Sequence, residues 1–163
     1  LSIVSYRLFC AVEMCSLRCK LYGSVIRPVM LYGAETWATT QAIENQIIRT
    51  DRKMLRWIHR ISLKEHMSAS DILERSCLCD IKDVLARHRL RWYGHVKRSN
   101  DPLIQSIIQL NVDGKRPRGR PQSTWWKCVN DDMKTFGVTE QDTMDRLKWK
   151  DKLRPTPGRG KWT

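Results

Sequence analysis

The sequence predicts a mainly α-helical protein, made of one or more small helical bundles joined by a basic loop rich in proline and glycine. Apolar residues recur every three or four positions along most of the 163-residue chain. No stretch alternates apolar and polar residues long enough to predict a strand. A chain of this length can bury the core of one ordinary domain or of two small helical lobes.

The first element is expected between Ser16 and Thr40. Pro28 lies within it and should bend or break a helix, because proline lacks the N–H that the helix needs and clashes with the preceding turn. One helix with a bend or two short helices are therefore predicted. The apolar residues at helical spacing are Leu17, Leu21, Val25, Val29 and Tyr32.

A second helix is predicted from Gln41 to Ile61, and its two faces differ in character. Asp51 is the single acid between Arg49 and Lys64, so like charges crowd the polar face and repel one another. A solvated surface or a phosphate-binding face would explain this, and the net charge of the chain favours the phosphate. The predicted apolar face is Ile43, Ile47, Met54, Trp57 and Ile61, and the opposite cationic stripe is Arg49, Arg52, Lys53, Arg56 and Arg60.

Two further helices are predicted before residue 100. Ser70 to Cys77 forms a short one, with Ser68 or Ser70 as its N-cap. Asp80 to Arg98 forms a longer one. Its apolar stripe contains Ile81, Val84, Leu85, Trp92 and Val96, and its basic flank contains Arg87, Arg91 and Arg98.

A short element capped by Asp101 should run from Pro102 to about Leu110, followed by the cationic segment Gly114–Pro121. Its prolines hold the backbone extended, which suits phosphate or a narrow groove. The segment is similar to the core of an AT-hook, in which an Arg-Gly-Arg centre lies in the minor groove, and a simple basic linker remains an alternative. Its basic residues are Lys115, Arg116, Arg118 and Arg120.

The last part of the chain predicts a helical pair. Ser123 or Thr124 should cap a helix that Gly137 ends, and its apolar face contains Trp125, Val129, Met133 and Phe136. Thr139 and Asp142 resemble a capping box that opens a final helix through Trp149. Residues beyond Leu153 are expected to be disordered.

These elements predict five segments along the chain. Helices with a basic face occupy 1–66, and a segment containing tryptophan and histidine occupies 67–110. A basic linker follows at 111–122. A C-terminal helical pair occupies 123–152, and a disordered tail occupies 153–163.

Charge and cysteine usage limit the class of protein. Thirty Lys plus Arg against seventeen Asp plus Glu give a net charge of +13, which makes a polyanion the expected partner. Arg7 and Glu13 interrupt the most apolar stretch, so neither a membrane span nor a secretory signal is predicted. The six cysteines are expected to be reduced, in a nuclear or cytoplasmic compartment, and secretion is not expected.

The sequence predicts no catalytic residue and no cofactor in this chain. Asp131 and Asp132 are neighbours on a predicted helix, so they diverge by about 100° and are interpreted as surface residues. Four nominal metal ligands have poor spacing for zinc, and the two histidines among them are interpreted as ordinary core histidines. This low-probability set is Cys77, Cys79, His88 and His95.

Four blocks, in the same order, resemble the C-terminal part of the reverse transcriptase of non-LTR (LINE-type) retrotransposons, over about Ser16 to Lys150. The first block is Leu-Tyr-Gly-Ala-Glu-Thr-Trp at 31–37, and the second is Arg-Lys-Met-Leu-Arg at 52–56. The third is Leu-Arg-Trp-Tyr-Gly-His-Val at 90–96. The fourth is the Gly-Lys-Arg-Pro-Arg-Gly-Arg-Pro segment at 114–121, followed by Trp125, Cys128, Val129 and Asp132.

The resemblance implies the helical thumb and adjoining region of a polymerase that copies RNA into DNA, with residues 1–66 as its palm-adjacent or thumb-like helices. The catalytic palm, its Mg²⁺-binding carboxylates and an endonuclease would precede Leu1, so this piece is expected to be inactive alone. Residues 1–15 match poorly, and whether they belong to the palm stays open. RNA, DNA or a hybrid could be the ligand. Two alternatives are a stand-alone DNA-binding protein that uses Arg118 and Arg120 in the minor groove, and an element-derived host protein that makes protein contacts.

Overall fold

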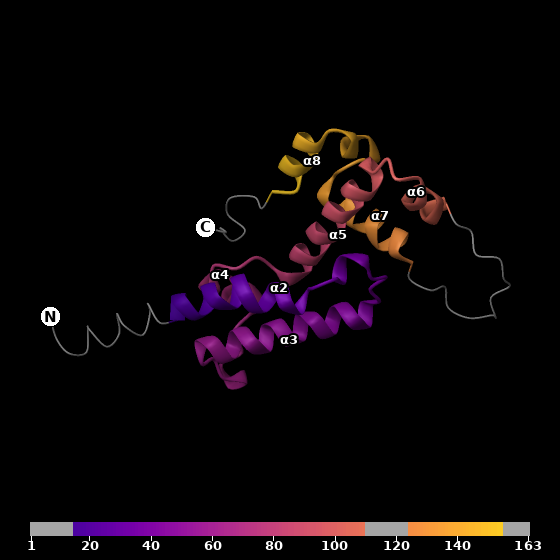
Figure 1. The fold of residues 1–163 in the computed structure, drawn as a ribbon. Helices are drawn as coiled ribbons and strands as arrows, with labels where there is room; N and C mark the ends of the chain where they lie inside the picture. The colour runs from indigo at the N-terminus through magenta and orange to yellow at the C-terminus, as the bar shows by residue number, and fades with distance from the viewer. Residues whose placement is uncertain (1–14, 110–123, 155–163) are drawn as a thin grey trace, which may run out of the picture. The chain divides into compact units, whose positions relative to one another are not determined.

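The computed structural model describes residues 15–109 and 124–154, and these residues form helices joined by turns, with no strand among them (Figure 1). The prediction of a mainly α-helical fold is confirmed. The described residues fall into two compact units. Unit 1 contains 15–33 and 41–85, and unit 2 contains 34–40, 86–109 and 124–154. The predicted basic loop and the part of the predicted tail beyond Arg154 lie outside the described residues. Leu153, where the disordered tail was expected to begin, is instead buried in the core of unit 2.

The first helical segment of unit 1 changes its winding before Pro28. Residues 15–21 are α-helical, η1 (Tyr22–Ile26) is a π-helix, and α2 (Arg27–Met30) completes the segment. A proline cannot donate to the carbonyl four residues earlier, and the wider π turn accommodates that missing bond. The segment ends at Met30, so the prediction of helix up to Thr40 is wrong in its second half.

The buried face of helix α3 (Gln41–His59) is shifted from the predicted one, although Ile61 is buried and Met54 packs against the core as expected. Ile43 and Trp57, which were assigned to the apolar face, are exposed. The buried residues of α3 are instead Asp51, Leu55 and Ile58. Relative to the predicted orientation, α3 is rotated so that Asp51 faces the core, because Arg27 lies there as its cationic partner. The spacing of apolar residues does not reveal such a partner.

The rest of unit 1 consists of η3 (Leu63–Glu65), α4 (Ala69–Ser76) and the start of α5 (Ile81–Arg98). The Ser68 hydroxyl accepts a hydrogen bond from the Asp71 amide at 3.2 Å, so Ser68 is the N-cap of α4. This confirms one of the two predicted caps. The buried core of unit 1 is Cys19, Tyr22, Leu55, Ile58, Ile61, Ile72 and Leu78.

Unit 2 contains η2 (Ala34–Thr36), the remainder of α5, α6 (Pro102–Gln109), α7 (Trp125–Phe136), η4 (Glu140–Met144) and α8 (Arg146–Lys152). Aromatic side chains dominate its core, and the Tyr93 ring meets the Trp126 ring edge to face at 5.9 Å between centroids. The buried core residues are Leu90, Tyr93, Val129, Val138, Trp149 and Leu153, with Trp125, Trp126, Met133 and Phe136 packed against them.

The helix ends of unit 2 follow most of the predicted signals. Thr124 caps α7 by accepting from the Lys127 amide at 3.3 Å, and Gly137 ends it in the left-handed conformation. The predicted capping box of Thr139 and Asp142 is present, but it opens the short η4. A separate cap, Asp145, starts α8, so the single final helix predicted from the sequence is two elements.

Gly94 allows two elements of unit 2 to pack closely. A Cβ atom at this position would lie 2.9 Å from Cδ1 of Trp149, and its indole nitrogen would also be too close. The Trp149 indole N–H donates to the Leu90 carbonyl at 3.2 Å, which holds the ring across α5. The absence of a side chain at Gly94 is therefore what seats α8 on α5.

Candidate nucleic-acid interface

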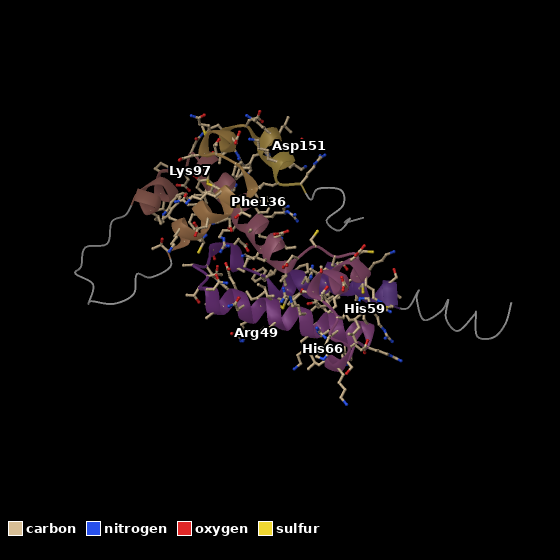
Figure 2. All side chains as sticks on the ribbon, turned by 180° about the vertical axis from the view of Figure 1, so that it is seen from behind. Arg49, His59, His66, Lys97, Phe136 and Asp151 are labelled. Atoms are coloured by element: carbon tan, nitrogen blue, oxygen red, sulfur yellow. The ribbon has the colours of Figure 1, made fainter. Side chains whose placement is uncertain are left out.

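The predicted cationic stripe on α3 is largely exposed. Arg49, Arg52 and Lys53 are exposed on the helix itself, and Figure 2 shows Arg49 projecting from its surface. At 100° per residue Arg49 and Lys53 lie opposite the buried Asp51 and Leu55, and Arg52 lies on the flank of that charged face. The face of α3 that packs in the core and the face that carries charge are therefore distinct, which leaves the charged face open to a ligand.

The last two members of the stripe are placed differently. Arg56 is half-buried, and its Nη2 donates to the Met67 carbonyl at 3.1 Å, so one edge of its guanidinium is occupied by the protein. Arg60 is exposed but lies beyond the end of α3, with φ +56°. The helical stripe predicted to extend through Arg60 thus ends with Arg56, and Arg60 continues it from a turn.

Trp57 is an exposed aromatic residue beside this charged surface, with 76% of its side-chain surface accessible. Helical geometry places it next to Lys53, one turn away on α3. Trp57 was expected in the core because it lies three residues after Met54 and four before Ile61, on the same side of a helix. An aromatic ring between basic side chains offers a surface on which a nucleic-acid base can stack.

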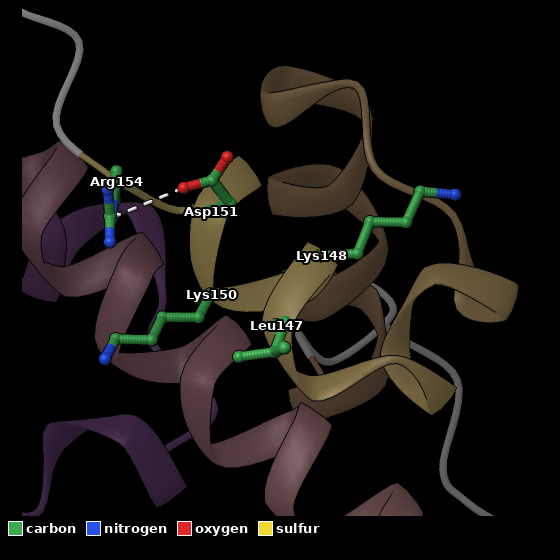
Figure 3. Close-up of a pocket in the computed structure, with 5 residues that line it drawn as sticks. All are labelled: Leu147, Lys148, Lys150, Asp151 and Arg154. Atoms are coloured by element: carbon green, nitrogen blue, oxygen red, sulfur yellow. Dashed lines mark ion pairs between the residues drawn. The ribbon is translucent and has the colours of Figure 1, made fainter.

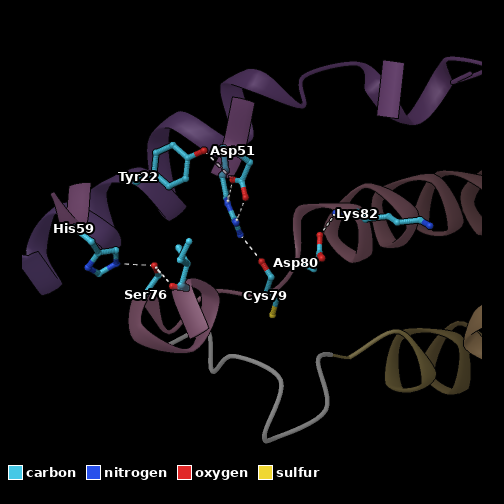
Figure 4. Close-up of polar contacts among 9 residues, drawn as sticks. Tyr22, Asp51, His59, Ser76, Cys79, Asp80 and Lys82 are labelled. Atoms are coloured by element: carbon cyan, nitrogen blue, oxygen red, sulfur yellow. Dashed lines mark hydrogen bonds and ion pairs between the residues drawn. The ribbon is translucent and has the colours of Figure 1, made fainter. Parts of the chain in front are cut away.

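A buried ion pair fixes the rotation of α3. The Arg27 guanidinium donates from Nε to Oδ1 and from Nη2 to Oδ2 of Asp51, both at 2.8 Å (Figure 4). The Tyr22 hydroxyl donates to the same Oδ1 at 2.8 Å, and Arg27 Nη1 donates to the Cys79 carbonyl at 2.7 Å. Burial, followed by the neighbouring Asp51 charge, raises the pKa of Tyr22 well above its ordinary value.

This arrangement explains the one acid in the basic segment. Arg27 and Asp51 are 1% and 2% exposed, so Asp51 does not neutralise the outer stripe and instead pairs in the interior. A buried carboxylate without a partner is strongly disfavoured, which restricts α3 to the rotation that meets Arg27. The ion pair thereby keeps the basic side chains on the outside.

The basic flank predicted on α5 does not form one exposed surface in unit 2. Arg91 is exposed, but Arg87 is 7% exposed and its guanidinium lies over the Phe136 ring at 5.7 Å. Arg98 is half-buried and donates from Nη1 to the Thr143 carbonyl at 2.5 Å. Arg87 and Arg98 thus serve packing and backbone contacts, and of these three arginines Arg91 alone is exposed.

The neighbouring residues Asp131 and Asp132 have different surroundings in the structure. Asp131 is exposed as predicted, whereas Asp132 accepts from Arg89 Nε at 2.6 Å. Arg89 is itself buried, and its Nη1 donates to the Thr39 hydroxyl at 2.6 Å. The interpretation of Asp132 as a surface residue is therefore wrong, because sequence spacing does not reveal a buried cationic partner on another helix. The remaining predicted binding residues, Lys115, Arg116, Arg118 and Arg120, lie outside the described residues.

The low-probability metal set is not among the ligand clusters of the described residues. His88 and His95 are two turns apart on α5, about 10 Å along its axis, which is too far for one ion. Burial, then the charge of Arg91, lowers the pKa of His88, consistent with a neutral core histidine, whereas His95 is exposed.

A different cluster of potential ligands lies in unit 1. The side chains of Cys15, Cys19 and His59 bring their ligand atoms within 4.8 Å of one another. Sequence analysis missed this cluster because 40 residues separate Cys19 from His59. The four-residue spacing of the two cysteines within a helical segment was the available signal. Burial raises the pKa of the Cys19 thiol to about 11.

A pocket on α8 carries positive charge but has no convergent geometry. Lys148 and Lys150 extend in opposite directions in Figure 3, and Arg154 Nε pairs with Asp151 at 3.4 Å. Lys148 also pairs with Asp142 at 3.0 Å. The basic side chains of this pocket therefore do not converge on a point where one anion could bind. The pocket residues are Leu147, Lys148, Lys150, Asp151 and Arg154.

None of the helices in the described part of the chain has the length and apolar character of a membrane span.

Comparison with known proteins gives one informative similarity. No family model and no solved structure matches the chain. The chain is 27% identical over 146 residues to an uncharacterized transposon-derived protein of Caenorhabditis elegans, an alignment that covers 82% of this chain. The chain spans about half the length, 52%, of that relative. This similarity supports a transposon origin for the sequence.

Proposed function

We propose that this chain is a nucleic-acid-binding C-terminal part of a retrotransposon reverse transcriptase, and that it acts through phosphate contacts. The transposon-derived relative and the four ordered sequence blocks support the origin. The binding role is carried by one observation. Exposed Arg49 and Lys53 lie on the face of α3 that is opposite its buried Asp51 and Leu55, and exposed Arg52 lies at the edge of that face.

Phosphate is the ligand chemistry that this face suits. The basic side chains lie about one helical turn apart, and a sugar-phosphate backbone presents charges at comparable spacing. Binding would also relieve the repulsion between like charges at i,i+4, a few tenths of a kcal/mol per pair. Base edges are not required, so the proposed contact is insensitive to sequence.

The test is the salt dependence of binding to labelled duplex DNA, duplex RNA and an RNA–DNA hybrid, measured by fluorescence anisotropy. If about six phosphates are contacted, log K should fall against log salt with a slope of about −5 on duplex DNA. The double variant Arg49→Gln/Lys53→Gln should make this slope shallower by about 2 and weaken binding to A·T-rich and G·C-rich sequences alike.

The matched control removes the same two charges at the same helical spacing on α8. Arg146 and Lys150 are both exposed and four residues apart, as Arg49 and Lys53 are. Arg146→Gln/Lys150→Gln should leave the slope nearly unchanged. Equal losses from both double variants would mean that total charge, not the α3 face, governs binding, and would contradict the proposal.

Two further outcomes would also overturn it. A strong preference for A·T-rich duplex that survives the α3 variant would favour the minor-groove protein. A slope near zero would favour an element-derived protein that contacts other proteins.

A further inference from the structure

We propose that Cys15, Cys19 and His59 form a zinc site in unit 1, with water as the fourth ligand. Two thiols and one imidazole are the donor types that zinc prefers, and three protein ligands with one open position are a known arrangement. The site is independent of the basic face of α3 and of the proposed nucleic-acid role.

The donor atoms are close together, although they are not yet at the separations of a bound tetrahedral ion. Cys15 Sγ lies 3.0 Å from His59 Nδ1, and Cys19 Sγ lies 3.5 Å from His59 Nε2. Zinc–nitrogen and zinc–sulfur bonds of about 2.05 and 2.3 Å at tetrahedral angles place N and S about 3.6 Å apart. Cys15 already lies beside Nδ1, whereas Cys19 lies beside the other ring nitrogen and must turn toward Nδ1 to share an ion. The ligand atoms of the three residues lie within 4.8 Å of one another, which is within reach of side-chain rotation.

The two cysteines are presented by one helical turn. Residues 15–21 are helical, so positions 15 and 19 lie on the same face of that helix. Cys19 is 4% exposed, and Cys15 packs against the core of unit 1. His59 is the last residue of α3, and the backbone turns away at Arg60 with φ +56°.

Ser76 selects the nitrogen of His59 that is available to the ion. The Ser76 hydroxyl donates its one hydrogen to the Ile72 carbonyl at 2.6 Å, so toward His59 it accepts (Figure 4). Nε2 of His59, 2.7 Å away, must then carry the hydrogen. Nδ1 is left with its lone pair directed at Cys15.

This is the outer-shell arrangement found at protein metal sites. A metal-binding histidine usually donates its other N–H to an oxygen atom, which fixes the tautomer and the ring orientation. Ser76 supplies that oxygen from the last turn of α4. The hydrogen bond to Ser76 leaves Nδ1 as the metal-binding nitrogen, with Cys15 beside it and Cys19 completing the set.

An ion here would connect the three separate segments of unit 1. Cys15 and Cys19 come from the first helix, His59 from α3, and the supporting Ser76 from α4. The core that the described residues of unit 1 bury is limited to seven side chains, and units with a small core often gain stability from a bound metal. Each thiol loses its proton to solvent as its thiolate binds Zn²⁺.

The experiment uses the full chain, purified with a reductant and stripped with a chelator, then titrated with Zn²⁺ or Co²⁺. We expect one ion per chain and a cobalt–thiolate absorption band. Zinc should also protect Cys15 and Cys19 from alkylation, mapped by mass spectrometry, and should leave the exposed Cys77 reactive. Far-UV circular dichroism of the metal-free chain verifies that each variant folds.

The variants separate ligands from neighbours. Cys15→Ser and His59→Gln should each weaken zinc binding by more than tenfold and alter the cobalt spectrum. Ser76→Ala, which removes only the outer-shell oxygen, should weaken it by about 10 to 100-fold while keeping one ion per chain. Cys77→Ser removes a thiol from the same unit and should leave the affinity unchanged.

Three results would overturn the assignment. The folded chain could fail to retain zinc after gel filtration. The cobalt–thiolate band could be unchanged in Cys15→Ser, or Cys77→Ser could weaken binding as much as Cys15→Ser does. If His59→Gln unfolds the chain, the alkylation pattern of the unaltered protein with and without zinc still decides between a ligand set and a simple hydrogen-bonded cluster.

Discussion

The cores of the two units are built from different kinds of side chain. Unit 1 encloses the Arg27–Asp51 ion pair, and both side chains are at most 2% exposed. The surrounding core consists of aliphatic residues together with Cys19 and Tyr22. Unit 2 has an aromatic core, and in one of its ion pairs, Arg89–Asp132, the aspartate is 14% exposed. Unit 1 therefore depends on the pairing of buried charges, whereas unit 2 depends on the fit of large rings.

This difference determines which substitutions each unit should tolerate. Removing one partner of an enclosed ion pair leaves the other charge without water or counter-ion, which is far more costly than losing the pair as a whole. An aromatic core is instead sensitive to steric changes, since rings at native packing density leave little free volume. Unit 1 should thus be the more sensitive to changes of charge and unit 2 to changes of shape.

The largest effect is expected from Asp51→Ala. The substitution isolates the Arg27 guanidinium and removes the acceptor of the Tyr22 hydroxyl, so unit 1 should lose about 3–5 kcal/mol of unfolding free energy. In unit 2, Asp132→Ala should cost less, about 1.5–3 kcal/mol, because solvent reaches that pair. Denaturant titration gives the magnitudes, and hydrogen exchange resolved by mass spectrometry assigns them to each unit.

The double variant Arg27→Met/Asp51→Leu sharpens this prediction. Apolar residues of similar size restore packing without buried charge, so the double variant should be more stable than Asp51→Ala. A double variant as unstable as the single one would show that the Cys79 carbonyl and the Tyr22 hydroxyl, which then lose Arg27 and Asp51, dominate the cost.

The sequence predicts elements better than it predicts their rotation. Helix boundaries followed from local chemistry, because caps such as Ser68 and Thr124 and the glycine at Gly137 act within a few residues. The buried face of α3 did not follow, since the inward rotation of Asp51 depends on Arg27, 24 positions earlier. Apolar periodicity assumes that polar residues face outward, and this ion pair violates that assumption.

For the candidate nucleic-acid interface and the thiol–imidazole cluster, too, the sequence predicts local features better than contacts between distant residues. The exposed positions of Arg49, Arg52 and Lys53 were predictable, because they lie on one side of a regular helix. The thiol–imidazole cluster was not predictable, because it joins residues 40 to 44 positions apart. Arg87 was assigned to a basic surface and is buried, because its long side chain covers the Phe136 ring of another helix.

A second test addresses shape in unit 2. Gly94→Ala places a methyl group against the Trp149 indole and the Arg98 guanidinium, and this overpacking should destabilise unit 2 by about 1–3 kcal/mol. The measurement is thermal unfolding with hydrogen exchange in α8. The matched control in unit 1 is Gly33, whose φ of +72° requires a left-handed residue but whose missing Cβ meets open space.

The two glycines should differ in which replacement they accept. Gly33→Asn should cost little, because asparagine adopts the left-handed conformation readily, whereas Gly94→Asn should be worse than Gly94→Ala. If Gly94→Ala leaves the stability of unit 2 unchanged, the Trp149 ring has room to move. The idea that steric fit limits substitutions in this core would then be wrong.

A third, smaller effect should depend on pH. Asp142 is contacted by Lys152 Nζ at 2.7 Å and by the Thr139 amide at 2.9 Å, and these contacts, that of Lys152 first, hold its pKa well below its ordinary value of 3.8. Its contribution is therefore present above pH 3.8 and is lost as the pH falls toward the folded-state pKa. As the pH falls below 3.8, the unfolding free energy monitored at η4 and α8 should decrease more steeply in the unaltered protein than in Asp142→Asn, which has no carboxylate to protonate at this position. Parallel decreases in the two proteins would contradict this linkage.

The smallest effects should be equal in the two units, because helix caps act locally and do not depend on core chemistry. Ser68 accepts from the Asp71 amide at 3.2 Å in unit 1, and Thr124 accepts from the Lys127 amide at 3.3 Å in unit 2. Ser68→Ala and Thr124→Ala should each cost about 1 kcal/mol in denaturant unfolding. Ser70→Ala, which leaves the cap in place, should cost a few tenths of that. A clear inequality between the two cap variants would mean that helix ends are coupled to the buried charges of one unit, and the contrast between the units would then extend beyond their cores.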